Sequence, residues 1–208
     1  MKINDKVYLL ESSRGSYVYL IKGNELTLID TGLSFMGKGI INELAKMNIN
    51  LQDIKHILLT HHDLDHIGNA VMLQRLTGAK LWASQEDIPY ITGSKQRYGF
   101  KKYLSYIFRV KKPENVISYK KNEKVAGIEI IPTPGHTPGH VCLLFEDVLF
   151  AGDLVDNHKG KLSHYPSNWN WDTSLLPNSI KTISNYSFKW VCPAHGRPIE
   201  KSSLKDIF

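Results

Sequence analysis

One short stretch of the chain is crowded with side chains that can bind a metal ion. It directly follows an apolar run typical of a buried strand and reads Thr60-His61-His62-Asp63-Leu64-Asp65-His66. Side chains at the end of a buried strand are held rigidly and face a cleft, where α/β proteins usually place their sites. A polar loop that caps the next helix through Asp65 is the alternative. We favour a metal site, because histidine and aspartate seldom cluster without one, and expect one centre for His61, Asp63, Asp65 and His66.

Three later segments each place a histidine or aspartate where a predicted strand meets a loop. The turn-rich stretch 133–140 contains His136 and His140, Asp153 follows a strand at 148–150, and His195 follows a strand at 189–192. Four such junctions are hard to explain as separate accidents. Together they strengthen the prediction of a metal centre.

The elements that must position these residues alternate between strands and helices. Apolar periodicity and turn residues predict strands at 7–10, 17–21, 26–30, 56–60, 81–83, 128–131, 141–145, 148–150 and 189–192, and helices at 40–47, 70–76 and 179–183. We predict one α/β domain over residues 1–208, with layers packed face to face. The segment after Asp153, which holds Tyr165 and Trp169, either lines a substrate pocket or packs as a surface loop.

The positive charge of the chain is concentrated in one predicted helical insertion at about 93–121. The whole chain carries +6, but residues 95–121 hold nine basic residues and one acid, so the remainder is slightly negative. Helical spacing predicts a basic amphipathic helix at 100–109 that packs by Phe100, Leu104 and Ile107 near the cleft and leaves Lys101 and Lys102 exposed. Such a helix could be a plain surface helix, or a lid whose charge concentrates anionic substrates.

Composition excludes several classes of protein. The chain has 208 residues, of which 42% are hydrophobic and 22% charged, as in a globular domain. No apolar run approaches the roughly 20 residues that cross a bilayer, and the start shows no leader-like apolar stretch. Cys142 and Cys192 do not form a disulfide framework and are expected in the core. We therefore expect a cytoplasmic protein that does not contact a membrane, as a monomer or homodimer.

The ordered set of motifs resembles the metallo-β-lactamase superfamily, hydrolases with an αββα sandwich. The resemblance rests on Ile29-Asp30-Thr31-Gly32, the cluster at 61–66, the His136 loop, Asp153 and His195, and so covers nearly the whole chain. It implies two divalent metal ions at one edge of the paired sheets. It assigns one ion to His61, Asp63 and His136, the other to Asp65, His66 and His195, and makes Asp153 a bridge. It leaves His140 outside the ligand set and makes Asp30 a support for the ligand loops.

One residue departs from the family pattern His-x-His-x-Asp-His. Counted back from Asp65 and His66, the second histidine is replaced by Asp63, while His62 is one position off and is expected to point elsewhere. An acidic residue here resembles the flavodiiron branch. Zinc is the expected metal, and manganese or iron are the alternatives, because oxygen ligands suit harder ions.

The resemblance implies a metallo-hydrolase similar to the short glyoxalase II-like members. A metal-bound hydroxide would attack an ester, thioester or lactone of a small molecule, which could be anionic, with Asp65 as the catalytic residue that orients the water and moves its proton. A phosphodiesterase or nuclease is supported only by the basic segment, and nucleic acid is not the expected partner. A non-haem iron oxidoreductase, sulfur dioxygenase-like or flavodiiron-like, is the alternative that Asp63 suggests.

Overall fold

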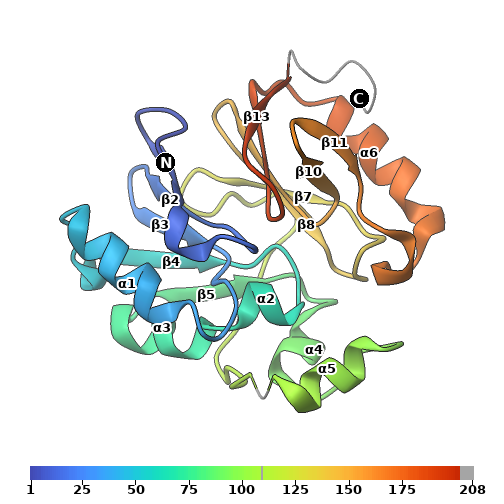
Figure 1. Ribbon diagram of the computed structural model, residues 1–208, viewed down its shortest axis with the longest axis horizontal. Coiled ribbons are helices and arrows are strands. Elements are labelled where there is room, and N and C mark those ends of the chain that lie inside the picture. Colours follow the sequence, from blue (N-terminus) through green and yellow to red (C-terminus); the bar gives the residue numbers. More distant parts are fainter. Residues whose placement is uncertain (109, 202–208) are drawn as a thin grey trace.

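The computed structural model describes residues 1–108 and 110–201 and shows two β-sheets between helices (Figure 1). The strands are β1 (Val7–Leu10), β2 (Val18–Lys22), β3 (Leu26–Ile29), β4 (Ile54–Leu58), β5 (Lys80–Ala83), β6 (Ile117–Ser118), β7 (Glu129–Pro132), β8 (Val141–Phe145), β9 (Val148–Gly152), β10 (Val155–His158), β11 (Lys161–His164), β12 (Trp190–Pro193) and β13 (Ile199–Glu200). The α-helices are α1 (Gly37–Lys46), α2 (Leu64–Ile67), α3 (Ala70–Thr77), α4 (Ile88–Thr92), α5 (Lys101–Ile107) and α6 (Leu176–Ser184). Short 3₁₀ turns are η1 (Glu11–Ser13), η2 (Leu51–Asp53), η3 (Ser167–Trp169) and η4 (Thr173–Leu175).

The first sheet has the order β1-β2-β3-β4-β5-β6, and the second has the order β13-β12-β9-β8-β7. In the first sheet β1, β2 and β3 form an antiparallel meander, and β3 to β6 run parallel. In the second sheet β7, β8 and β9 are antiparallel and β12 is parallel to β9. Parallel neighbours send their carboxyl ends to the same edge, which is what brings β4 and β5, or β9 and β12, to a common site.

Alternating apolar residues divide the core into layers. In β2, Val18 and Leu20 pack toward α1 and α3, whereas Tyr19 and Ile21 pack between the sheets. Successive side chains of a strand point to opposite faces, so a strand that is apolar throughout must be covered on both sides. On the second sheet the outer face is covered by α6, which contributes Ile180 and Ile183. The result is the predicted αββα arrangement, visible in Figure 1.

Each strand and helix predicted from periodicity has a counterpart whose bounds lie within three residues of the expected ones, and the structure adds elements that were not predicted. The segment after Asp153 forms the antiparallel hairpin of β10 and β11 before it continues into η3. Two-residue β6 and β13 extend the sheets at their edges. Within the described residues, no helix is both long enough and apolar enough to cross a membrane.

The predicted orientation of the basic helix is wrong for Phe100, Ile107 and Lys101 and confirmed for Leu104, which faces the site. Phe100 is 38% exposed and Ile107 71% exposed, whereas Lys101 is only 3% exposed. The helix α5 is also shorter than expected, and Arg109, at its predicted end, lies outside the described residues. The physical reason is an ion pair: Lys101 reaches Asp63, which turns the face of Lys101 and Leu104, rather than that of Phe100 and Ile107, toward the protein.

Candidate metal centre

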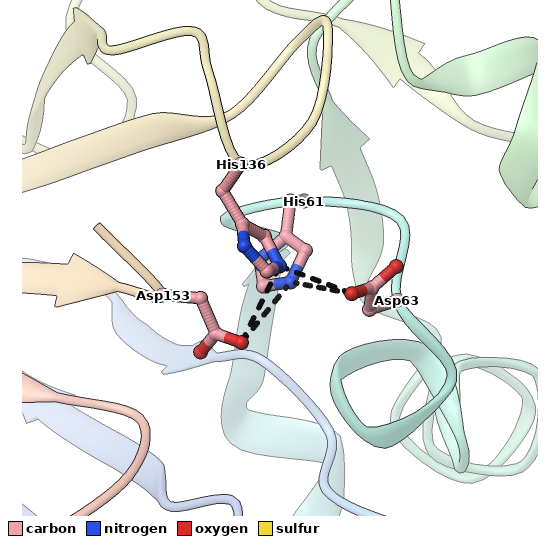
Figure 2. A group of neighbouring side chains, drawn as sticks. All are labelled: His61, Asp63, His136 and Asp153. Atoms are coloured by element: carbon pink, nitrogen blue, oxygen red, sulfur yellow. Dashed lines mark hydrogen bonds and ion pairs between the residues drawn. The ribbon is translucent and has the colours of Figure 1, made fainter. Parts of the chain in front are cut away.

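The seven predicted ligands lie together at one edge of the two sheets. The segment 61–66 leaves β4 and forms α2, the loop of His136 precedes β8, Asp153 follows β9, and His195 follows β12. Their donor atoms form two groups, each with all donors within 4.8 Å of one another: His61, Asp63, His136 and Asp153, and then Asp65, His66 and His195. Figure 2 shows the first group, whose side chains converge from three separate segments of the chain.

The first group has the spacing of donors around a common centre. Asp63 Oδ2 lies 3.0 Å from His136 Nε2 and 3.7 Å from His61 Nε2. Asp153 Oδ2 lies 3.4 Å from His136 Nε2 and 3.8 Å from His61 Nε2. Tetrahedral ligands at bond lengths near 2.1 Å stand about 3.4 Å apart, so a divalent ion fits between these four atoms.

The second group uses the other oxygen of the same aspartate. Asp153 Oδ1 lies 3.3 Å from His66 Nε2 and 3.4 Å from His195 Nε2. Asp65 Oδ2 lies 3.2 Å from His195 Nε2 and 3.6 Å from His66 Nε2. Asp153 therefore presents one oxygen to each group. Its placement needs Gly152 before it, at φ +50°, since a Cβ there would lie 2.6 Å from His140 Nε2.

Polar atoms of both groups are buried without a hydrogen-bond partner among the described residues. They are His61 Nε2, Asp63 Oδ1, His66 Nε2, Asp153 Oδ1 and His195 Nε2. Buried polar groups are costly unless they are paired or bind a metal. Two divalent cations would supply partners for all of them except Asp63 Oδ1, which faces His62 Nε2 at 3.8 Å, so the donor set fits the implied ions.

Three neighbouring side chains hold the other ring nitrogens of the histidines. His66 Nδ1 lies 2.8 Å from Asp30 Oδ2, and His136 Nδ1 lies 2.9 Å from Asn170 Oδ1. The Thr60 hydroxyl donates to Asp30 and so accepts from His61 Nδ1 at 3.0 Å. Each contact places a proton on Nδ1 and leaves the Nε2 lone pair for a metal. The sequence pointed to Asp30, but not to Asn170, which lies 34 residues from its partner.

His62 and His140 lie outside both groups. His62 stacks on Tyr90 with ring centroids 4.4 Å apart, and its Nδ1 is 3.1 Å from Asp87 Oδ1. Buried Asp87 also accepts hydrogen bonds from the backbone N–H of His62 and of Gly139, and so joins two ligand loops. His140 Nε2 accepts the backbone N–H of Asp153 at 3.1 Å. Sequence reasoning missed Asp87, whose partners are 25 and 52 residues away.

Two basic residues of the insertion enter the site and were also missed. Lys101 Nζ lies 2.5 Å from Asp63 Oδ2 and 3.4 Å from His136 Nε2. The guanidinium of Arg97 is buried and donates to the backbone carbonyl of His62. A buried carboxylate requires a cationic or hydrogen-bonding partner, so Asp63 itself was the signal that could have prompted a search for one.

The pKa values of the metal-free donor groups are set by these ion pairs and by burial. Burial alone would raise the pKa of Asp63, but Lys101 and then His136 hold it well below its usual range. Burial would lower the pKa of His195, but Asp153 and then Asp65 outweigh it and raise that pKa to about 10. A metal ion at His195 must therefore displace a proton, which couples metal binding to pH.

A cavity of about 260 Å³ opens directly over both groups. Its polar side is formed by Asp63, Asp65, Arg97, Lys101 and His195, and the rest of its wall is mainly apolar: Leu33, Leu64, Leu104, Phe108, Tyr165 and Trp169. Trp169 packs edge-on against Phe100, with ring centroids 4.5 Å apart, so the insertion and the segment after β11 close over the site together. The segment after Asp153 thus lines the cavity through Tyr165 and Trp169, whereas His158 and His164 are exposed.

Known proteins share this architecture and parts of this sequence. Residues 13–182 match the family model described as "Metallo-beta-lactamase superfamily". The chain is 26% identical to the probable metallo-hydrolase YqjP of Bacillus subtilis, over 88% of this chain and 67% of that protein. It is 30% identical to the hydroxyacylglutathione hydrolase GloC of Haemophilus influenzae, over 69% of this chain and 66% of that protein. A metallo-beta-lactamase family protein from Thermus thermophilus superposes with a TM-score of 0.75 at 23% identity, covering 96% of this chain and 76% of that one, which confirms the fold.

Proposed function

This chain belongs to the metallo-β-lactamase superfamily as one of its metallo-hydrolases, and we propose that it uses two divalent metal ions to hydrolyse an ester, thioester or lactone of a small molecule. One observation carries the proposal: two groups of metal donors share Asp153 on the polar side of a cavity lined otherwise by apolar side chains. A shared carboxylate between two donor groups is the arrangement expected for a two-metal hydrolytic site.

The ligand assignment follows the two groups. His61, Asp63 and His136 would hold one ion, Asp65, His66 and His195 the other, and Asp153 both. Ions held there would supply a water nucleophile at neutral pH and stabilise negative charge on the substrate oxygen. Zinc suits the imidazoles, and the three carboxylates also admit manganese or iron.

Asp65 is the proposed catalytic residue. Its side chain is 25% exposed and lines the cavity, whereas the side chain of Asp153 is 2% exposed. Asp65 Oδ2 lies beside His195 and the carboxylate lines the cavity, so this side chain can accept a hydrogen bond from a water molecule there and take up its proton. His66 is fixed by Asp30 and His195 by Asp153, and both rings lie beside Asp65 Oδ2. These two histidines therefore keep the Asp65 carboxylate oriented.

The cavity supports a small and mainly apolar substrate. Its walls offer Leu33, Leu104, Phe108 and Trp169 to the acyl or alkyl part of an ester. Both basic side chains of the insertion on the cavity wall are already engaged within the protein, because Lys101 pairs with Asp63 and Arg97 donates to the carbonyl of His62. The name of GloC describes a thioester hydrolase, which supports including thioesters among the substrates tested.

The test combines metal analysis with a substrate panel. Purified protein, loaded separately with zinc, manganese or iron, would be assayed with esters, thioesters, lactones and phosphodiesters while oxygen is monitored. We expect hydrolysis of at least one carbonyl substrate, lost on chelation and in Asp65→Asn, and kept in the control Asp172→Asn. Oxygen consumption without hydrolysis would favour the iron oxidoreductase instead, and cleavage of phosphodiesters alone would favour the nuclease.

A further inference from the structure

Lys101 places a buried cation against the first donor group. Its side chain is 4% exposed, and its Nζ lies 2.5 Å from Asp63 Oδ2. The same atom is 3.4 Å from His136 Nε2. The shorter of these two distances is to the carboxylate, so the ammonium stands beside Asp63 and acts on that ligand first.

The insertion that carries Lys101 is anchored to the ligand loops. The Tyr98 hydroxyl donates to the backbone carbonyl of His136 at 2.8 Å, and Phe100 packs against Trp169. Arg97 donates to the carbonyl of His62, next to Asp63. These contacts flank Lys101 on the N-terminal side, and they fix where α5 begins. The position of the ammonium is therefore built into the fold.

The charges around two divalent ions explain why a cation belongs there. Asp63, Asp65 and Asp153 bring three negative charges and leave the two ions with one surplus positive charge. A neutral imidazole at position 63 would leave two. The Lys101 ammonium restores that second positive charge, so Asp63 and Lys101 together have the charge of a histidine.

We propose that Lys101 is a positioning residue of the metal centre, which neutralises Asp63 so that this carboxylate can serve where a neutral ligand would otherwise stand. This inference rests on the two-metal site of the proposed function. Lys101 draws electron density from Asp63 and keeps its Oδ2 oriented, so the ion receives less negative charge than from an unpaired carboxylate. Because an unpaired buried charge is costly, neither member of the pair should be replaceable alone.

A double-mutant cycle tests this coupling without a substrate. Zinc affinity and stoichiometry would be measured by competition with a chromophoric chelator for the wild type, Asp63→His, Lys101→Met and the double variant. Asp63→His removes the carboxylate that pairs with Lys101 and leaves the ammonium unpaired beside the ions. The binding of one ion should therefore weaken by roughly 10- to 100-fold, which is the usual effect of changing a residue that contacts a metal ligand. In the double variant the affinity should return to within about threefold of the wild type. Lys102→Met, one residue along the chain, is the matched control and should change nothing.

The result that would contradict this coupling is that the effects of the two substitutions on zinc affinity simply add. If Lys101→Met changes zinc affinity by the same factor with Asp63 as with His at that position, Lys101 supports the fold only and the inference is wrong. Far-UV circular dichroism checks folding, and Asp63→Asn, with and without Lys101→Met, provides a second cycle if Asp63→His does not fold. Coupling without hydrolysis of any substrate would refute the proposed function alone, hydrolysis without coupling would refute the Lys101 role alone, and a wild type that binds no divalent ion would refute both.

Discussion

Asp30 is the residue whose replacement makes the sharpest prediction, because it fixes the proton of a histidine proposed to bind metal. It is 2% exposed and has a left-handed backbone, at φ 60°, which aspartate tolerates better than most residues. Its Oδ1 accepts the backbone N–H of Thr60, and its Oδ2 accepts the Thr60 hydroxyl and His66 Nδ1–H, each at 2.8 Å. We expect Asp30→Asn to keep the shape of this arrangement and change its protons.

In Asp30→Asn only one of the two side-chain atoms can still accept hydrogen bonds. If the amide oxygen keeps the Thr60 N–H, the amide nitrogen faces His66 Nδ1 and must donate to it. The imidazole proton then moves to Nε2, the atom that lies 3.3 Å from Asp153 and belongs to the second donor group. A metal ion on Nε2 would force that proton back to Nδ1, where it would face an amide N–H instead of a carboxylate.

The size of the effect follows from the hydrogen bonds that the substitution removes. Hydrogen bonds to a charged group contribute about 1.5–3 kcal/mol, so metal-free Asp30→Asn should unfold with a free energy lower by roughly 2 kcal/mol. The second ion should bind roughly 10- to 100-fold more weakly, and the first ion nearly as before. Asp30 is also the main group that raises the pKa of buried His66, against the effect of burial. The stabilisation that comes with this raised pKa is fully present below about pH 6.5 and is lost as pH rises through the pKa of the folded state. The difference in unfolding free energy between the wild type and Asp30→Asn should therefore shrink at alkaline pH.

The assay is urea unfolding after chelation, paired with a two-site zinc titration. Asp5→Asn is the control, since the side chain of Asp5 is 95% exposed and pairs with Lys2 at the surface, away from the donor groups. Equal weakening of both ions, or none, would contradict the idea that Asp30 acts through the tautomer of His66.

Three further predictions concern residues around the donor groups. His62→Phe should keep the metal content of the wild type by elemental analysis, since His62 lies outside both groups, and the loss of an ion would mean that it is a ligand after all. Burial first, and then the charge of His136, lower the pKa of His140 to about 3. The unfolded chain therefore binds a proton below about pH 6.5 that the folded chain does not, so unfolding free energy should fall with decreasing pH by up to about 1.4 kcal/mol per unit, and His140→Gln should flatten that slope. Phe100→Ala removes the edge contact with Trp169 and should raise KM about 2- to 10-fold with little change in kcat, whereas a fall in kcat alone would show that this contact does not hold the cavity wall.

Most of the fold could be predicted from the sequence because it follows from local patterns. Apolar runs mark β4, β8 and β9, and the turn residues that follow them mark the edge where the site lies. The same logic separated Asp63 from His62, since adjacent side chains point in different directions. The structure shows this separation directly: His62 pairs with Asp87, and Asp63 faces His136. Whether these side chains bind metal stays a prediction for the titrations above.

The site residues that could not be predicted from the sequence have one feature in common: their partners are distant in the sequence. Asn170 meets His136 across 34 residues, and Asp87 meets Gly139 across 52. Neither residue lies in a periodic pattern or in a cluster of ligands. The hairpin of β10 and β11 was missed for another reason: its short strands carry few apolar residues and were grouped with the loop that follows Asp153.

The wrong orientation of α5 shows how one ion pair decides between two helical faces. Phe100, Leu104 and Ile107 form the predicted apolar face, and Lys101, Leu104 and Phe108 form another, which shares Leu104 and is otherwise displaced by one residue. Apolar content alone favours burying the first face. Burying the second becomes favourable once Asp63 is buried, because that carboxylate needs a cation and Lys101 can reach it from this face alone. The departure from the family pattern at position 63 and the unexpected face of a helix that begins 38 residues later are thus one feature: a charge placed in the first donor group and the countercharge that the insertion supplies.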